Sequence, residues 1–337
     1  MKIIVTGGAG FIGSNLILYL FEKNKDWHIY NIDKLTYASD RGFLDPLKDS
    51  ERYHFKKIDL VDRKAVQDVV KTFQPDGVIH LAAESHVDNS IAGPEPFILS
   101  NVVGTFNILE ECRQLWGTGE DSWKNNRFLH VSTDEVYGEL EDDGLFTETT
   151  PYAPNSPYSA SKAGSDMIVR SYYQTYKMNV VTTNCSNNYG PHQHDEKLIP
   201  TVIRNAVQHN PIPVYGKGQN VRDWLFVKDH CRALETAFLK GKAGETYNVG
   251  GNNEWKNLDL VEKICELLNS ELGKGPKGDY KNLINFVTDR LGHDFRYAID
   301  ASKIKKELDW EPSGYFDGML RETILWYLDK YQESIKK

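Results

Sequence analysis

The chain is poor in cysteine and has no long apolar run. Its four cysteines lie far apart and form no Cys-x-x-Cys pair: Cys112, Cys185, Cys231 and Cys265. We therefore expect buried, reduced thiols, with neither a disulfide framework nor a metal site. No apolar stretch approaches the length that crosses a bilayer. The short apolar start, Met1 to Val5, becomes glycine-rich at once and fits a strand better than a signal peptide. These shortages favour a cytoplasmic protein.

Positive charge is also in short supply. The 337 residues include 40 Lys and Arg against 48 Asp and Glu, a net charge of −8. Without a basic tract, nucleic acids and anionic membranes are poor partners. Phosphorylated ligands remain open, because they need only a few local cations. No internal repeat or low-complexity segment is present, and the length suits one large α/β domain or two closely packed ones.

What the chain does contain is a regular alternation of strand and helix patterns. Strand patterns cover residues 2–6, 27–32, 53–58, 77–83, 128–132 and 179–186. Helix patterns cover residues 14–23, 64–73, 101–115 and 157–178. This order predicts an α/β fold with a doubly wound parallel, Rossmann-type sheet. Ligands of such sheets bind where the carboxyl ends of the strands meet.

A glycine-rich turn separates the first strand from the first helix. Its glycines, Gly7, Gly10 and Gly13, permit a tight turn, the approach of a pyrophosphate and close helix–strand packing. The helix N-terminus can then receive phosphate charge. Asp33 ends the second strand, 20 residues past Gly13, where an acid can bind the adenosine ribose and repel a 2′-phosphate. The motif predicts a dinucleotide site that prefers NAD to NADP.

A tyrosine and a lysine four residues apart open a later helix. Ser156 suits the N-cap and Pro157 the first helical position. Tyr158 and Lys162 therefore share one helix face. Because a neighbouring cation favours the ionised form of a phenol, this pair can supply a base near neutral pH.

A hydroxyl and two carboxyls follow the fifth strand pattern: Thr133, Asp134 and Glu135. A simple dehydrogenase needs one acid/base group beside its cofactor, so this triplet adds a second acid/base pair. Elimination of water requires a base and an acid at neighbouring carbons. One carboxyl must then be neutral at working pH, which burial or its neighbour's charge can bring about.

These motifs resemble the extended short-chain dehydrogenase/reductase superfamily and, within it, the dTDP-glucose 4,6-dehydratase family. The segments that carry the resemblance span nearly the whole chain: residues 6–13, 81–88, 132–138, 158–163, 185–191, 222–224 and 289–294. The Thr-Asp-Glu triplet is the specific part, since 4-epimerases of the superfamily lack that acid/base pair. Three residues depart from the family pattern: Asn89, Leu291 and Phe295 stand where arginine, proline and arginine are expected.

The resemblance implies an NAD-dependent hydro-lyase of deoxysugar biosynthesis, of the dTDP-rhamnose type. Its reaction is the conversion of dTDP-glucose to dTDP-4-keto-6-deoxyglucose and water, by oxidation at C4, elimination across C5 and C6, and hydride return to C6. By this resemblance Tyr158, supported by Lys162, takes the 4-hydroxyl proton and Thr133 binds the same oxygen. Glu135 removes the C5 proton, and Asp134 protonates the departing 6-hydroxyl.

The resemblance also implies binding residues. Those expected at the cofactor are Gly7, Gly10, Phe11, Ile12, Gly13, Asp33, Asp59, Leu60, Leu81, Ala82, Ala83, Tyr158 and Lys162. Those expected at the substrate are Ser85, His86, Asn187, Asn188, Lys197, Leu198, Arg222, Asn257, Arg290, His293 and Tyr297. Arg222 and Arg290 match positions that hold the nucleotide diphosphate.

The carboxyl-terminal part is richer in Pro, Asn and Gly after Ser186, which is typical of a loop-rich substrate lobe. We expect residues 1–185 to form the NAD-binding domain, with a return segment at about 224–250. Residues 186–223 and 251–337 would form a smaller α+β lobe that binds the sugar nucleotide. In relatives, helices matching 101–115 and 157–178 pair across a homodimer.

Three alternatives stay open. A UDP-glucose 4-epimerase would use Tyr158, Lys162 and NAD but has no need of Asp134 and Glu135. Another NAD-dependent dehydratase, acting on UDP-GlcNAc or GDP-mannose, would keep the chemistry and change the base pocket. A non-catalytic NAD-binding regulator would have no use for the Tyr–Lys pair and the two carboxyls.

Overall fold

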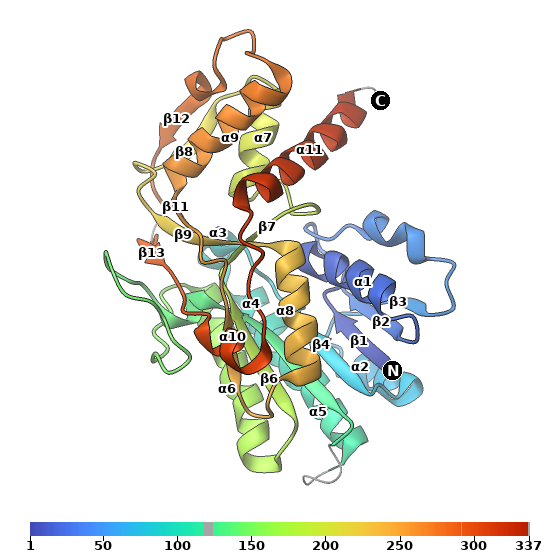
Figure 1. Cartoon of the computed structure of the whole chain (residues 1–337). Coiled ribbons are helices and arrows are strands. Elements are labelled where there is room, and N and C mark those ends of the chain that lie inside the picture. Colours follow the sequence, from blue (N-terminus) through green and yellow to red (C-terminus); the bar gives the residue numbers. More distant parts are fainter. Residues whose placement is uncertain (118–123, 291, 336–337) are drawn as a thin grey trace.

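A seven-stranded parallel sheet forms the centre of the molecule (Figure 1). The structure is a computed structural model that describes residues 1–117, 124–290 and 292–335. The strands are β1 (Lys2–Thr6), β2 (His28–Asp33), β3 (Tyr53–Lys57), β4 (Gly77–His80), β5 (Arg127–Thr133), β6 (Val180–Cys185) and β10 (Thr246–Val249). Their order is β10-β6-β5-β4-β1-β2-β3, and every pair is parallel. The order reverses between β1 and β4, so a ligand crevice is expected there.

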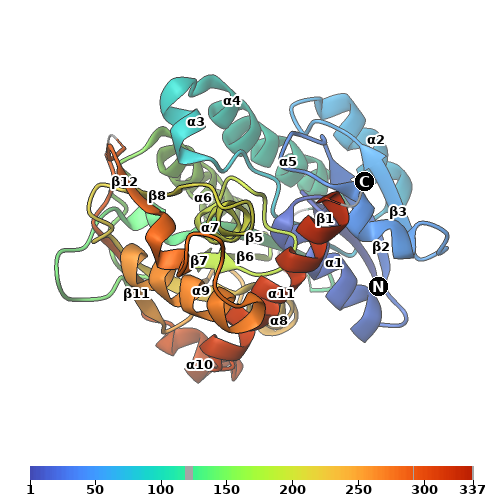
Figure 2. The same cartoon turned by 90° about the horizontal axis from the view of Figure 1, so that it is seen from above.

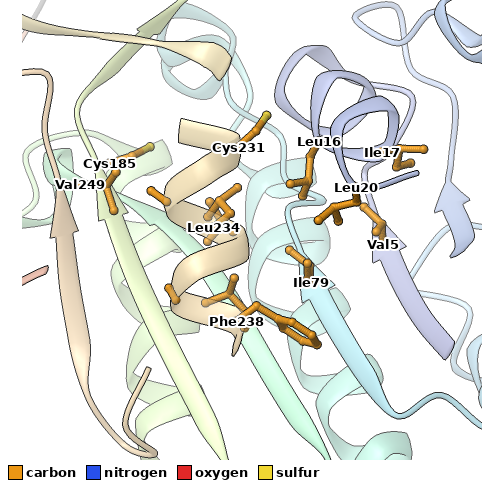
Figure 3. Close-up of a cluster of buried hydrophobic side chains, with 14 of the residues drawn as sticks. Val5, Leu16, Ile17, Leu20, Ile79, Cys185, Cys231, Leu234, Phe238 and Val249 are labelled. Atoms are coloured by element: carbon orange, nitrogen blue, oxygen red, sulfur yellow. The ribbon is translucent and has the colours of Figure 1, made fainter. Parts of the chain in front are cut away.

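Helices cover both faces of this sheet. One face carries α1 (Phe11–Lys23), α8 (Val227–Lys240) and α10 (Ser302–Leu308), and the other carries α2 (Arg63–Phe73), α5 (Gly104–Trp116) and α6 (Pro157–Tyr176). Because strand side chains alternate between faces, Ile3 and Val5 pack under α1 and α8 while Ile4 packs against the opposite helices. Figure 3 shows the first of these cores, with Leu16 and Leu20 on α1 and Leu234 and Phe238 on α8.

The rest of the chain builds a smaller lobe beside the carboxyl ends of the strands (Figure 1). One small sheet contains β7 (Asn187–Tyr189), β9 (Val221–Phe226), β11 (Glu254–Lys256) and β13 (Arg296–Tyr297), and β8 (Ile212–Tyr215) pairs with β12 (Ile284–Val287). The helices of this lobe are α7 (Leu198–Val207), α9 (Asn257–Leu272) and α11 (Phe316–Ile335). A separate buried cluster, which includes Tyr189, Leu260 and Ile324, forms its core.

Short helical pieces complete the connections. They are the α-helices α3 (Val87–Ala92) and α4 (Glu95–Phe97), the π-helix η2 (Ile98–Val103) and the 3₁₀ turns η1 (Arg41–Leu47), η4 (Asp134–Tyr137) and η5 (Tyr280–Leu283). Among the described residues, no helix is both long and apolar enough to span a membrane.

The doubly wound sheet predicted from the sequence is confirmed, and most differences are at element ends. The strand expected at 77–83 stops at His80, and the helix expected at 101–115 begins in a π-helix. Ser156 does cap α6: its hydroxyl accepts the Ser159 N–H in a capping box, and Pro157 is the first helical residue. The short strands β7, β9, β11, β12 and β13 were not predicted, because each owes its conformation to distant pairing partners.

Candidate active site

A cleft of about 320 Å³ lies along the carboxyl ends of β1, β2, β4, β5 and β6. Every residue assigned from the sequence to the cofactor or to catalysis lines it: Gly7, Gly10, Phe11, Ile12, Gly13, Asp33, Asp59, Leu60, Leu81, Ala82, Ala83, Thr133, Asp134, Glu135, Tyr158 and Lys162. Four of the expected substrate residues line it as well: Ser85, Asn187, Asn188 and Lys197. One cleft thus joins the glycine turn to the two carboxyls.

The glycine turn leaves room only for backbone. Gly7 has φ +71°, and a Cβ there would lie 2.7 Å from the backbone nitrogen of Ala82, which follows the end of β4. A Cβ on Gly13 would lie 2.2 Å from the Gly7 carbonyl oxygen, so the helix could not approach the turn. Helix α1 starts after Gly10 with no side-chain cap. Its first N–H groups are therefore available to a phosphate at the cleft.

Asp33 occupies the other end of the same turn. Its carboxylate is buried and accepts hydrogen bonds from the backbone of Ala9 (2.9 Å) and Leu35 (2.8 Å) and from the Ser39 hydroxyl (3.2 Å). An ionised carboxyl accepts up to about four hydrogen bonds, so it keeps capacity for one more from a ribose hydroxyl. Because the ionised Asp33 carboxylate is negative and has no proton to donate, it repels a phosphate on the ribose 2′-oxygen. The turn, the helix end and this acid fit NAD.

Tyr158 and Lys162 lie at the opposite end of the cleft, on α6. The Lys162 ammonium is buried and donates to the Val131 carbonyl at 2.8 Å. Burial raises the pKa of Tyr158 well above its ordinary value, and the charge of Glu135 raises it further, while a hydrogen bond with Thr133 lowers it. The sequence predicted a phenol held ionised by Lys162 together with the charge of a bound nicotinamide. Burial is the largest influence on this phenol in the protein itself, so Lys162 alone does not ionise it.

The two carboxyls have different surroundings. Asp134 is 1% exposed, and its Oδ2 has no hydrogen-bond partner among the described residues. Burial raises the pKa of Asp134 well above its usual range, and the charges of Glu135 and Asp223 add to the effect. Burial also raises the pKa of Glu135, but Arg222, Lys197 and Arg290 oppose that rise. This difference leaves Asp134 protonated and makes Glu135 the more easily ionised partner.

Three cations thus act on the Glu135 side of the cleft. Lys197 lines the cleft, and its Nζ reaches the Ser85 carbonyl at 3.3 Å. Arg222 is buried, with its guanidinium 4.3 Å from the Tyr297 ring centroid and a bond of 2.8 Å to the Asp294 carbonyl. Arg290 lies 3.7 Å from the Asp88 carboxylate. In an acidic chain, three cations around one carboxylate point to a further anion.

Seven expected substrate residues lie around this region without lining the cleft: Arg222 and Arg290, described above, and His86, Leu198, Asn257, His293 and Tyr297. The His86 imidazole is 3.6 Å from the Glu196 carboxylate, and the His293 imidazole is 2.6 Å from the Asp289 carboxylate. Tyr297 donates its hydroxyl to Asp294. Leu198 and Asn257 are the first residues of α7 and α9, and the Asn257 Oδ1 is buried without a hydrogen-bond partner in the described chain.

The three departures from the family pattern are placed differently. Asn89 donates to the Tyr37 hydroxyl at 2.9 Å near the cleft mouth. Phe295 is partly exposed, and its backbone N–H donates to Glu139. Leu291 lies outside the described residues. Neither Asn89 nor Phe295 lines the cleft.

Sequence reasoning missed a group of lining residues near the cofactor end: Lys34, Thr36, Ala38, Ser39 and Ser100. The first four directly follow Asp33, so their position after a strand end was an available signal. Near the chemistry it missed Cys185, Gln193, His194 and Glu196, which also line the cleft. Cys185 ends β6 and opens the 185–191 segment of the resemblance, so a signal for it was available. No local motif marks the other three, because tertiary packing brings the 193–196 loop to the cleft.

The switch-point cleft, the glycine turn and the Tyr158–Lys162 pair define the class of protein as an extended short-chain dehydrogenase/reductase. Within that class the comparisons are specific. Residues 4–323 match the family model described as GDP-mannose 4,6 dehydratase. The dTDP-glucose 4,6-dehydratase of Salmonella typhimurium is 52% identical over 342 residues, covering 98% of this chain and 94% of the relative.

Solved structures agree. The dTDP-glucose 4,6-dehydratase of Bacillus anthracis in complex with NAD is 44% identical with a TM-score of 0.87, and 98% of each chain is covered. The Streptomyces venezuelae enzyme of the same name, in a complex that contains NAD, is 40% identical with a TM-score of 0.89 and the same coverage. The chain belongs to the dTDP-glucose 4,6-dehydratase family.

Proposed function

We propose that this protein converts dTDP-glucose to dTDP-4-keto-6-deoxyglucose and water, in a cytoplasmic pathway of deoxysugar biosynthesis of the dTDP-rhamnose type. The observation that carries the proposal is the pair Asp134 and Glu135 inside the cleft, beside Tyr158, in surroundings that separate their pKa values. The names of the most similar relatives support the substrate.

Each reacting group has a matching side chain. Bound NAD supplies a hydride acceptor for C4, a hydride donor for C6 and, when oxidised, a positive charge near the phenol. Tyr158 takes the proton of the 4-hydroxyl, and the Thr133 hydroxyl steadies the same oxygen. Each positioned acid or base is worth about 10²–10⁴ in rate.

The elimination uses the two carboxyls. The 4-ketone acidifies the C5–H bond, and ionised Glu135 removes that proton. A C5–C6 double bond forms as the C6–O bond breaks, and protonated Asp134 donates its proton so that the oxygen leaves as water. After hydride returns to C6, C5 regains a proton from Glu135. Glu135 thus ends the cycle in its starting protonation state. Tyr158 holds the proton of the 4-hydroxyl and Asp134 has lost one to the released water, so transfer of one proton from Tyr158 to Asp134 through solvent restores both groups.

The substrate's charged end fits the cation group. Lys197, Arg222 and Arg290 would neutralise a diphosphate placed between the two lobes. Asn187 and Asn188, on β7, line the cleft, and the Asn187 amide can bind sugar or phosphate oxygens. The Asn188 amide donates to the Ser186 carbonyl at 2.9 Å and holds the strand end beside it. We assign the cofactor domain to residues 1–185 with a return segment at about 224–250, and the substrate lobe to 186–223 and 251–337. Helix α10 packs with the cofactor domain through its buried core.

We also propose a homodimer. Apolar side chains are exposed over α3, η2, α5 and α6: Ile91, Ile98, Leu99, Phe106, Met167 and Tyr176. Figure 2 shows α3, α4 and α5 along one edge of the molecule. An apolar patch of this kind is suited to burial against a second copy. Sedimentation of the wild type against Leu99→Glu tests the assignment, and a monomeric wild type would contradict it.

The substrate is tested with a panel of sugar nucleotides. The purified protein is incubated with NAD and dTDP-glucose, UDP-glucose, UDP-GlcNAc or GDP-mannose, and product masses are measured. Loss of one water from dTDP-glucose alone is expected. Loss of water from another nucleotide would change the substrate, and inversion at C4 without a change of mass would indicate an epimerase.

A further inference from the structure

A buried carboxylate lies one helical turn beyond Lys162. Asp166 is 3% exposed and belongs to none of the catalytic groups above. Its Oδ2 accepts hydrogen bonds from the Ser132 hydroxyl at 2.8 Å and the Tyr152 hydroxyl at 3.0 Å. Its Oδ1 lies 2.8 Å from the His130 Nε2. Three polar groups from β5 and a loop thus converge on one side chain of α6.

These contacts connect the two elements that carry the chemistry. His130 and Ser132 flank Val131 on β5, and the Val131 carbonyl accepts the Lys162 ammonium at 2.8 Å. Helix α6 therefore holds three consecutive residues of β5. The next residues of that strand lead into the Thr-Asp-Glu triplet, while Tyr158 lies one turn before Lys162 on the helix.

The charges around Asp166 are complementary. Burial lowers the pKa of His130, so a neutral imidazole donates its Nε2–H to the carboxylate. Tyr152 and Lys162 also face Asp166. The ring of His80 lies 5.5 Å from the ring of His130. Burial lowers the pKa of Lys162, and the charge of Asp166 opposes that effect. Asp166 thereby favours the protonated lysine.

We propose that Asp166 is a positioning residue, which locks the Tyr158–Lys162 helix to the end of β5 so that phenol and carboxyl pair face the same sugar. This inference rests on the proposed function. A displacement of about 1 Å at a reacting group can cost about 10²-fold in rate. The carboxylate does not line the cleft, so its loss should slow the chemistry without weakening ligand binding.

The test uses Asp166→Asn, which keeps the side-chain shape and removes the charge. Its matched control is Asp229→Asn on α8. Asp229 is a buried carboxylate outside the cleft, and it accepts hydrogen bonds from Arg232 and Ser313. We expect kcat per NAD-containing site to fall about 10²-fold in Asp166→Asn, with KM for dTDP-glucose changed by less than about threefold. The isotope effect of deuterium at C4 should increase, because hydride transfer becomes slower. The control should lose thermal stability but not kcat.

A milder variant keeps the test decisive if Asp166→Asn folds poorly. Tyr152→Phe removes one of the hydrogen bonds to Asp166 and leaves the charge, so a loss of about three- to tenfold in kcat is expected. Crystal structures of the wild type and of Asp166→Asn give a measurement that does not depend on activity. The 2.8 Å contact between the Lys162 ammonium and the Val131 carbonyl should lengthen or break in the variant.

Three results would overturn the proposal. They are an unchanged contact between Lys162 and Val131, a kcat close to that of the control, or a change in KM that matches the change in kcat. If the wild type itself releases no water from dTDP-glucose, the proposed function fails, and the crystallographic comparison still decides whether Asp166 positions the helix.

Discussion

Replacement of Glu135 by glutamine separates the oxidation from the elimination. The amide has the same shape as the carboxyl and fills the same partly buried place, but it cannot accept the C5 proton. Tyr158 can still take the 4-hydroxyl proton. Oxidation at C4 should therefore proceed while water stays on the sugar, and NADH should accumulate on the enzyme.

The size of the effect follows from the role of the base. A positioned general base contributes about 10²–10⁴ in rate, which corresponds to about 2.7–5.4 kcal/mol at 1.36 kcal/mol for each factor of ten. The structure adds a second effect of known sign. The Glu135 charge raises the pKa of Tyr158, so its removal should lower that pKa. The pH at which NADH formation is half-maximal should therefore be lower in Glu135→Gln than in the wild type.

The assay is a rapid-mixing measurement of NADH absorbance after dTDP-glucose is added to the NAD-loaded enzyme, with product masses measured in parallel. Glu141→Gln is the control, because Glu141 is an exposed glutamate outside the cleft. Normal release of water by Glu135→Gln would remove Glu135 as the base. Failure to form any NADH, in a variant that still binds NAD and substrate, would show that the carboxylate is required for the first step.

Three further variants and a pH profile test other parts of the site. Tyr158→Phe should abolish NADH formation while NAD stays bound, and retained hydride transfer would remove Tyr158 from the first step. Asp134→Asn should slow elimination about 10²–10⁴-fold. The same variant should raise Tm by about 1–3 °C at neutral pH. A carboxyl whose pKa is raised in the folded state lowers the stability at pH values above its unfolded pKa of about 4, and the amide removes that cost. Calorimetry should therefore show a higher Tm at neutral pH and no increase of Tm in acid. Gly7→Ala should lose NAD binding and much of its folded yield, because the new methyl meets the Ala82 backbone at 2.7 Å with φ at +71°; equilibrium dialysis that finds normal NAD affinity would contradict this. Finally, since burial raises the pKa of Glu135 and its ionised form is the base, the acid limb of kcat should lie above the range of an ordinary glutamate; a limb near pH 4 would contradict the assignment.

The sequence was informative wherever a feature depends on neighbours in the chain. The β1 run from Ile3 to Val5 is apolar because helices cover both faces of its sheet, which the alternation of elements already implied. Gly7 and Gly13 are required by backbone geometry within one turn. The cap of α6 at Ser156 is likewise local, so its start was predictable to the residue.

Tertiary structure decided the features that depend on distance in space. Arg222 and Arg290 act on Glu135 from positions far along the chain, and their effect on its pKa arises only once the two lobes fold together. The phenol of Tyr158 shows the same limit. The chain spacing placed Lys162 on its helix face, but the largest influence on the pKa of Tyr158 is burial, which the spacing does not reveal. Spacing along a chain determines which backbone shapes are possible, whereas desolvation and Coulomb forces depend on what the fold places around each group. The sequence alone therefore predicted the sheet, the glycine turn and, through the family resemblance, the candidate acid and base. Only the folded molecule supplies the burial and charges that separate the pKa values of Asp134 and Glu135.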